Sequence, residues 1–265
     1  AFNLFVILGH IAVIPTVYSS ARMLDLSRWR ALGASAFAVL IWYFDGLTHW
    51  CWYIGLISYD MVAYMGLFPI ALLWSFLRRG GSYKLILMGL FLGILHMVHP
   101  YVFLGAAIPM FAMYAMHFRQ MRRVDHLRVL LGGVLVVILN LWWLATAIRF
   151  WHYVGDSGVL GQGSISLLLS DFFGLISDTT VTGVIGNRTG FRNAALIVGA
   201  LGILMWRGRK DPRSMPFAVS LLAMIALAYL GGYVWIARQI QPYRHVLPAM
   251  FLALIPATDF LFEAF

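Results

Sequence analysis

Residues 85–118 read LILMGLFLGILHMVHPYVFLGAAIPMFAMYAMHF, and a basic residue stands at each end of this apolar run, Lys84 before it and Arg119 after it. Short loops that are rich in lysine and arginine stay on the cytoplasmic side of a membrane. Both ends of the run therefore belong on that side. The run must then cross the membrane an even number of times.

The dipeptide His99-Pro100 shows where the run turns back. Proline disfavours helical backbone in the residue before it, so a break is expected at this point. A spanning helix usually needs about 17 to 25 apolar residues, and the first half of the run is short by that measure. We expect two short spans, 85–98 and 101–118, that meet near the outer face.

The composition of the whole chain agrees with a membrane protein. Hydrophobic residues make up 62% of the chain and charged residues 11%, and the mean hydropathy is +0.85. A soluble domain with this composition could not cover its core with polar surface. The net charge of +9 comes from separate clusters rather than from one stripe, so we expect contact with anionic membrane lipids and no binding of nucleic acid.

The placement of the 19 basic residues predicts the topology. Fourteen lie in four clusters between apolar stretches, namely Arg22/Arg28/Arg30, Arg78/Arg79/Lys84, Arg119/Arg122/Arg123/Arg128 and Arg207/Arg209/Lys210/Arg213. Placing every cluster inside gives an outer N-terminus and a cytoplasmic C-terminus. The predicted fold is all-α, a single transmembrane domain (residues 1–265) with nine spans, at 2–19, 31–45, 61–77, 85–98, 101–118, 128–148, 193–206, 215–234 and 246–262.

A polar segment, residues 149–191, is expected on the outer face. Within it, residues 165–176 read ISLLLSDFFGLI, with small and polar residues recurring every four positions. This pattern predicts an amphipathic helix that lies in the membrane interface. The chain has one cysteine, so no disulfide can form within it.

Asp45 and His49 are candidate catalytic residues on the outer face. They are four residues apart, which places one above the other if the helix continues past Phe44. A carboxylate beside an imidazole can orient the ring for acid–base chemistry. The alternative is a pair that only stabilises a helix end. Asp60 is explained at this stage as the N-cap of the third span.

A second group of candidates is predicted to bind the substrate. Arginine at a helix start suits a phosphate, because its planar guanidinium donates two hydrogen bonds at once. The alternative for these arginines is anchoring to lipid headgroups. His99 is added because polar residues at membrane depth usually mark sites, and the full set is His99, Arg238, Tyr243, Arg244 and His245.

No signature of a metal site or of nucleotide chemistry is present. His96 and His99 are three residues apart, but a two-histidine site needs further ligands, and no HExxH or CxxC pattern accompanies them. We therefore expect no cofactor and no metal, and leave open whether a divalent cation takes part.

Three stretches carry a resemblance to a known family. Val17–Leu32 (VYSSARMLDLSRWRAL) is similar to an early inner loop, Leu95–Leu104 (LHMVHPYVFL) to a split pair of short spans, and Gln241–Pro248 (QPYRHVLP) to the arginine-containing entry of a late span. Together they resemble the GT-C type integral membrane glycosyltransferases, especially the relatives of dolichyl-phosphate-mannose-dependent mannosyltransferases.

This resemblance implies a multi-pass enzyme of the cell envelope, in a bacterial or archaeal cytoplasmic membrane, that takes a sugar from a polyprenyl-phosphate donor at the outer face. It also implies a catalytic Asp or Glu in a first external loop. No such acidic loop precedes the span at 2–19. We therefore expect the sequence to be a fragment that starts after that loop; the alternative is that this relative has lost the acidic residue.

Other functions are left open by the sequence. A non-catalytic subunit that scaffolds other membrane subunits is consistent with the aromatic content of 15%. A haem or pigment protein would need histidines at matched depth on different helices, which His10, His49, His96 and His99 do not offer. A transporter would need more ionisable residues in mid-membrane.

Overall fold

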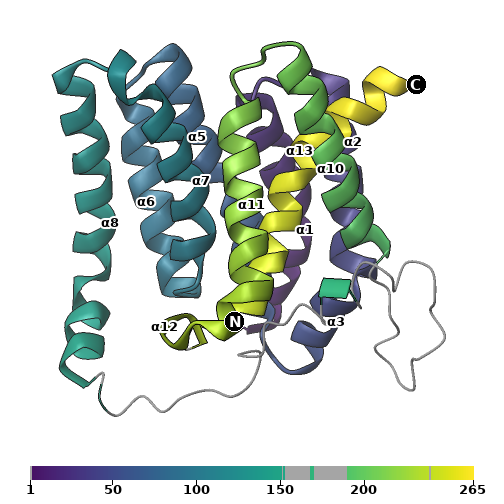
Figure 1. Ribbon diagram of the computed structural model, residues 1–265. Coiled ribbons are helices and arrows are strands. Elements are labelled where there is room, and N and C mark those ends of the chain that lie inside the picture. Colours follow the sequence, from purple (N-terminus) through teal and green to yellow (C-terminus); the bar gives the residue numbers. More distant parts are fainter. Residues whose placement is uncertain (1, 151, 153–167, 170–189, 239) are drawn as a thin grey trace.

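The computed structural model describes residues 2–150, 152, 168–169, 190–238 and 240–265, and this part of the chain is helical and without strands (Figure 1). The predicted all-α class is confirmed. The helices are α1 (Phe2–Met23), α2 (Arg28–Phe44), α3 (Gly46–Tyr53), α4 (Ile57–Met65), α5 (Leu67–Arg79), α6 (Tyr83–Val98), α7 (Val102–His117), α8 (Arg123–Phe150), α10 (Gly190–Gly208), α11 (Ser214–Leu230), α12 (Trp235–Arg238) and α13 (Val246–Ala264). Short 3-10 turns follow α7 (η1, Phe118–Gln120) and α11 (η3, Gly231–Tyr233) and precede α13 (η4, Pro242–His245).

Several of these helices are able to cross a membrane. Among the described residues, six helical segments are long and apolar enough, and a seventh is added when α2 and α3 are taken as one bent span. α6 is apolar but shorter. These lengths are compatible with a multi-pass integral membrane protein. The predicted interfacial helix at 165–176 lies outside the described residues, apart from positions 168–169.

The four basic clusters lie at one end of the bundle. In Figure 1 the turns from α1 to α2, α5 to α6, α7 to α8 and α10 to α11 are at the top with the C-terminus, whereas the N-terminus, α3 and α12 are at the bottom. Contacts between loops agree, since Arg79 donates to the carbonyl of Met23 (2.8 Å) and Arg213 to that of Leu24 (3.0 Å). We call the two ends the basic end and the opposite end.

The break at His99-Pro100 is confirmed. α6 ends at Val98, His99 has an extended backbone (φ −160°), and α7 begins at Val102. Proline at position 100 excludes helical geometry from the preceding residue. The turn therefore lies at the opposite end, far from the basic loops.

α2 ends at Phe44, close to the predicted end of the second span, so the condition for stacking Asp45 above His49, a helix that continues past Phe44, is not met. Asp45 has an extended backbone (ψ 134°), and the chain bends by 52° between α2 and α3. The Asp45 side chain accepts hydrogen bonds from the N–H groups of Leu47 and Thr48. It therefore begins a new helix as its N-cap.

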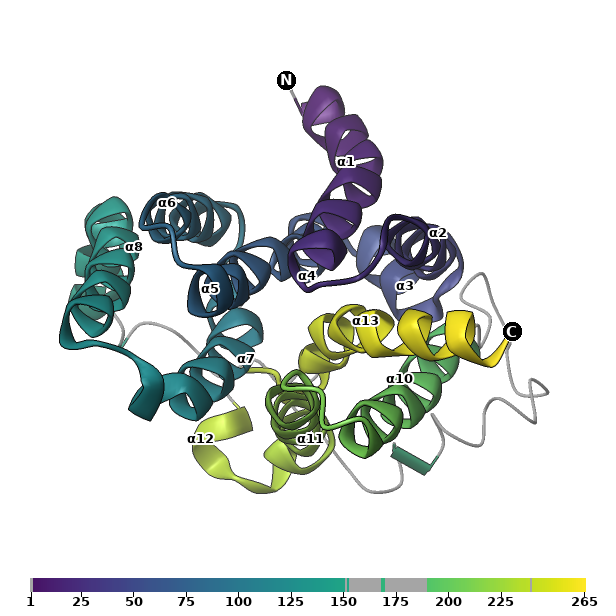
Figure 2. The same cartoon turned by 90° about the horizontal axis from the view of Figure 1, so that it is seen from above.

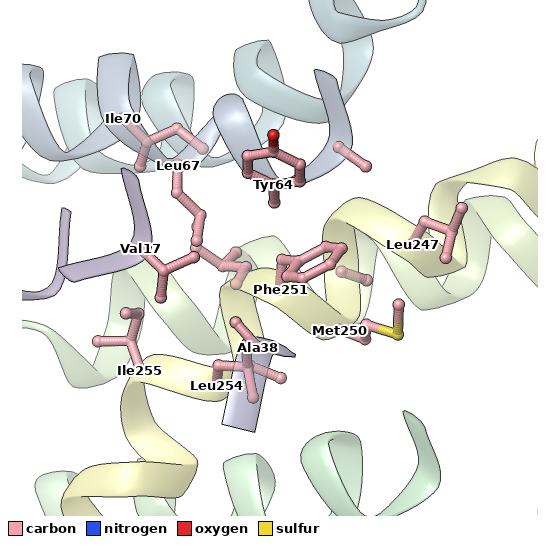
Figure 3. Close-up of a cluster of buried hydrophobic side chains, with 14 of the residues drawn as sticks. Val17, Ala38, Tyr64, Leu67, Ile70, Leu247, Met250, Phe251, Leu254 and Ile255 are labelled. Carbon is pink, nitrogen blue, oxygen red and sulfur yellow. The ribbon is translucent and has the colours of Figure 1, made fainter. Parts of the chain in front are cut away.

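α13 runs through the middle of the bundle, with most of its length buried (Figure 2). Its neighbour α10 approaches closely because small residues face it. A Cβ added at Gly202 would lie 2.1 Å from the carbonyl oxygen of Pro256, and one added at Gly199 2.8 Å from that of Ala253. Small residues at helix contacts are typical of membrane bundles. On its other faces α13 meets α1, α2 and α4 around Tyr64 and Phe251 (Figure 3).

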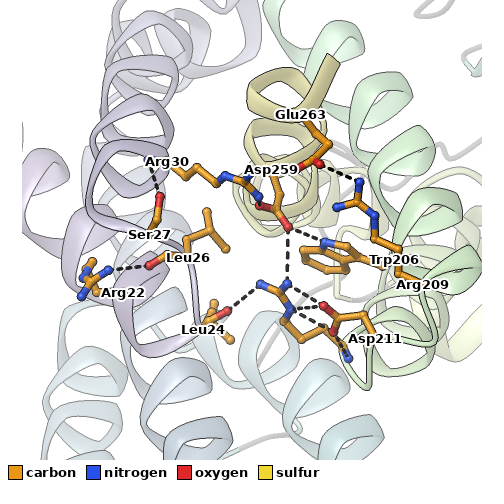
Figure 4. A network of polar contacts seen from close by, with 11 residues as sticks. Arg22, Leu24, Leu26, Ser27, Arg30, Trp206, Arg209, Asp211, Asp259 and Glu263 are labelled. Atoms are coloured by element: carbon orange, nitrogen blue, oxygen red, sulfur yellow. Dashed lines mark hydrogen bonds and ion pairs between the residues drawn. The ribbon is translucent and has the colours of Figure 1, made fainter. Parts of the chain in front are cut away.

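A network of ion pairs joins α13 to α2, α10 and the loop after α10 at the basic end (Figure 4). The buried carboxylate of Asp259 pairs with Arg30 and lies 3.3 Å from the guanidinium of Arg213. It also accepts a hydrogen bond from the indole of Trp206 (2.6 Å). Arg213 in turn binds Asp211 at 2.6 Å. This network is structural and lies at the end remote from Asp45 and Arg244.

Candidate functional site

A buried group of acidic, basic and aromatic side chains gathers near the opposite end of the bundle. The two acids of the group are Asp45, between α2 and α3, and Asp60, in the first turn of α4. The two arginines are Arg192, in the first turn of α10, and Arg244, in η4. All four side chains are buried. Charged groups at membrane depth are costly, so a cluster of them favours a functional site.

Asp45 has its carboxylate committed to the backbone of α3. Oδ1 accepts from the N–H of Leu47 at 3.0 Å and from that of Thr48 at 3.2 Å, and Arg192 lies 3.8 Å from the same oxygen. These contacts hold the carboxylate in place and favour its charged form. His49 is half-buried, and its ring centroid lies 5.1 Å from that of Trp52. The bend at Asp45 thus removes the stacked arrangement on which the predicted pair depended.

Arg244 is enclosed by aromatic rings. Its guanidinium carbon lies 5.3 Å from the ring centroid of Tyr59 and 5.1 Å from that of Tyr101. The hydroxyl of Tyr59 also donates a hydrogen bond to the backbone carbonyl of Arg244. Cation–π contacts of this kind stabilise a desolvated guanidinium. The Nε of Arg244 has no hydrogen-bond partner among the described residues, so the group retains donor capacity.

Asp60 is buried inside the bundle and is not the cap of α4 that the sequence predicts. Leu56, not Asp60, precedes α4 as its N-cap, and the Asp60 side chain makes no capping bond. The residue is only 1% exposed, and no N–H or O–H group within the described part of the chain donates to its carboxylate. The thiol of Cys51, a weak donor, lies against it, and Arg244 and Asp45 are within electrostatic range. A buried carboxylate without an N–H or O–H donor is rare and requires an explanation.

The turn between α6 and α7 covers Arg244. The His99 ring stacks on Tyr101 at 5.3 Å and meets Tyr59 edge-on at 5.3 Å. Its Nδ1 accepts from the N–H of Tyr101 at 3.3 Å. Burial, together with the charge of Arg244, lowers the pKa of His99 to about 4, because both disfavour the imidazolium. His99 is therefore neutral at physiological pH.

The structure brings together some of the predicted substrate-binding residues and separates others. His99, Arg244 and His245 share one site, and neither ring nitrogen of the buried His245 is hydrogen-bonded to a described residue. Tyr243 is buried but packs on Tyr229 at 5.9 Å. Arg238 is exposed, and its Nε donates to the carbonyl of Gly232 at 2.6 Å.

A small cavity lies beside this cluster. It has a volume of about 10 Å³, adjoins Tyr59 and Tyr101, and continues between α4, α5 and α7. This volume suits about one water molecule. The ring of Tyr101, in the α6–α7 turn, lies 5.1 Å from the guanidinium carbon of Arg244. No three His, Cys, Asp or Glu side chains gather as metal ligands in the described ranges.

The chain was also compared with known proteins. No protein-family model, no curated protein and no solved structure matches it.

Proposed function

We propose that this protein is a membrane glycosyltransferase that takes a sugar from a polyprenyl-phosphate donor at the opposite end of the bundle, on the outer side of the membrane. The observation that carries the proposal is the buried pair of Asp60 and Arg244. The carboxylate receives no N–H or O–H hydrogen bond from any described residue and only the weak thiol donor of Cys51, and the guanidinium keeps donor capacity. A base and an anion-binding group that lie together in a membrane bundle are the two elements that such a transfer needs.

Arg244 is the group that binds the donor phosphate. Its planar guanidinium matches phosphate geometry with two parallel hydrogen bonds. In the free protein the rings of Tyr59 and Tyr101, which meet edge to face, both lie against it. The donor phosphate takes the place of the Tyr101 ring, while Tyr59 remains anchored to the backbone of Arg244. In this exchange Arg244 loses its cation–π contact with Tyr101 and gains a charge-assisted hydrogen-bonded pair with the phosphate.

Asp60 is the base. It takes the proton of the acceptor hydroxyl as the hydroxyl oxygen bonds to the anomeric carbon of the sugar. The bond from that carbon to the phosphate oxygen breaks, and polyprenyl phosphate leaves with the electron pair. Arg244 stabilises the charge on the leaving group. Asp45 has a different role, because its carboxylate already accepts two backbone N–H bonds: it positions α3 and Arg192 around the site.

The topology in this proposal has nine crossings. α6 and α10 run between the same two ends as the longer helices (Figure 1). The chain reverses direction in the turn before α6 and again in the turn after it. The nine crossings are α1, the bent unit of α2 and α3, the unit of α4 and α5, α6, α7, α8, α10, α11 and α13. With this number every basic cluster lies on the same side of the membrane. The opposite end, with Asp45, Asp60 and Arg244, is then the outer one.

Transfer from a polyprenyl-phosphate sugar in proteoliposomes tests the proposal. Asp60→Asn and Arg244→Lys are expected to lower turnover at least about a hundredfold, the lower range for removal of a general base or a charge-stabilising donor. Arg238→Gln is the matched control, because Arg238 is exposed and bonded to Gly232. Full activity in Asp60→Asn contradicts the assignment of the base.

A second candidate is a non-catalytic subunit that scaffolds a membrane complex. The engagement of Arg244 by the rings of Tyr59 and Tyr101 favours it. Its signature would be stoichiometric co-purification with other membrane subunits, together with no turnover of any lipid-linked sugar by the assembled complex.

A further inference from the structure

An apolar groove opens between α7 and α8. α8 packs closely against α6 through small residues, since a Cβ added at Gly89 would lie 2.8 Å from the carbonyl oxygen of Gly132. Asn140 on α8 also donates a hydrogen bond to the carbonyl of Gly93 on α6 at 3.1 Å. α8 lies at the edge of the bundle, and α7 is separated from it (Figure 2). The space between them is a groove of about 380 Å³.

The groove has the length of one membrane leaflet. Its wall on α7 runs from Phe103 to Tyr114, about 17 Å at the rise of an α-helix. One leaflet contributes about 15 Å of hydrocarbon. Its wall on α8 includes Gly133, where an added Cβ would meet nothing within 4 Å. The groove is thus long and narrow, and, apart from the Tyr114 hydroxyl, its walls are apolar.

A second, more polar cavity continues the groove toward the basic end. It has a volume of about 480 Å³, shares Phe111 and Tyr114 with the first, and ends at Arg119 and Gln120. Arg119 is exposed, and no ion pair joins it to any described residue. The hydroxyl of Tyr114 and Nδ1 of His126 lie 2.8 Å apart at this mouth.

The charge at the mouth is strongly positive. Arg122 and Arg128 both pair with Asp125, each at 3.0 Å, and this is the acid of the α7–α8 turn. Arg119 and Arg123 therefore add positive charge that no carboxylate of that turn balances. Clusters of basic residues at the cytoplasmic membrane surface attract anionic lipids.

We propose that this groove is a binding site for one anionic phospholipid of the cytoplasmic leaflet. One acyl chain lies between α7 and α8 along Phe111 and Gly133, and the headgroup phosphate pairs with Arg119. The charge at the mouth selects an anionic headgroup, and the leaflet-length groove selects a chain. The proposal does not depend on the proposed transferase, because the headgroup contact, Arg119, is at the basic end and Arg244 is at the opposite end.

Native mass spectrometry of the purified full chain tests the site, with phosphatidylglycerol and phosphatidylcholine as probes. The wild type is expected to retain one phosphatidylglycerol in preference to phosphatidylcholine. Arg119→Gln is expected to reduce that preference about fivefold, the factor that one basic residue contributes at an anionic surface. Arg28→Gln, an exposed arginine at the same end but on α2, is the control and keeps the preference.

The groove itself is tested by filling it. Gly133→Phe is expected to abolish retention of both lipids, whereas Ile138→Phe, at a 60% exposed position of α8 that does not line the groove, leaves retention unchanged. Val137→Phe repeats the test at a second groove position that is 52% exposed and tolerant of a larger side chain. Equal retention of the two lipids by the wild type overturns the proposal, as does wild-type retention in both groove variants.

Discussion

Asp259 ties four parts of the chain together at the basic end, and replacing it with asparagine removes the charge while keeping the shape. The carboxylate is 4% exposed. It binds Arg30 from α2, Arg213 from the loop after α10, and Trp206 from α10. Asparagine can still accept the indole bond, so the change isolates the two ion pairs.

The magnitude follows from what each arginine keeps. Arg30 retains its pair with Glu263 at 2.8 Å, and Arg213 retains Asp211 at 2.6 Å. Removing one member of a fully buried pair costs about 3–5 kcal/mol. Because both arginines keep a partner and Arg30 is 28% exposed, we expect the free energy of unfolding to fall by about 3 kcal/mol. For a chain of this size that corresponds to a Tm lower by about 6–12 °C.

Unfolding can be followed at the chain's single cysteine, Cys51, which is fully buried. A thiol-reactive fluorophore labels it only when the bundle opens, so heating the detergent-solubilised protein with the fluorophore gives the Tm. Glu263→Gln is the matched control. Its side chain is 36% exposed, and such surface pairs contribute about 0–1 kcal/mol. Equal Tm values for Asp259→Asn and Glu263→Gln would refute the reasoning.

The other predictions concern the opposite end and the helix contacts. Asp60→Asn changes the free energy of unfolding by less than about 1 kcal/mol, because no N–H or O–H group of a described residue donates to its oxygens and asparagine can still accept from the Cys51 thiol; the thiol-labelling Tm checks this, and a loss as large as that of Asp259→Asn contradicts it. His99 has a pKa lowered to about 4, so the unfolded chain takes up a proton first as the pH falls. Stability is therefore retained above about pH 6.5 and declines toward pH 4; burial lowers the pKa of His245 to about 4 as well, so His99→Gln should make this part of the Tm–pH curve shallower without removing the decline, and an unchanged slope contradicts the pKa of His99. Gly202→Val forces α10 away from Pro256, where an added Cβ would lie 2.1 Å from the carbonyl oxygen, and we expect a loss of at least about 2 kcal/mol; Gly208→Val, with open space around it, is the control, and equal Tm values for the two variants contradict the close approach.

Local signals predicted the helix break and the sorting of charges. His99-Pro100 breaks the helix through proline geometry alone, which needs no tertiary information. The basic clusters share one end in the structure because the same rule governs every short loop. The number of crossings does not follow from local signals alone. Six or seven described helical segments are long and apolar enough to cross a membrane, whereas a shorter helix such as α6 crosses only as part of the packed bundle.

The candidate site was only partly visible in the sequence. Arg244, His245 and His99 were recognised as polar residues near helix ends. The sequence predicts a cap at Asp60, because a carboxylate at a helix start is usually one. The proximity of Asp60 to Arg244 cannot be predicted locally, because it arises only when α4 packs against η4 in the folded chain. The predicted second span ends at Asp45, next to the end of α2 at Phe44, whereas the start of α3 depends on the Asp45 side chain, which bonds to the amides of Leu47 and Thr48.

The central claim is that Arg244 binds the phosphate of a polyprenyl-linked donor. Equilibrium binding of radiolabelled polyprenyl phosphate and of the uncharged polyprenol to the purified protein tests it most directly. The account predicts that the wild type and Arg238→Gln bind the phosphate at least about tenfold more tightly than the alcohol, a difference of about 1.4 kcal/mol, and that Arg244→Gln binds the two equally. A wild-type protein that does not distinguish the two lipids, or an Arg244→Gln variant that still does, would contradict it.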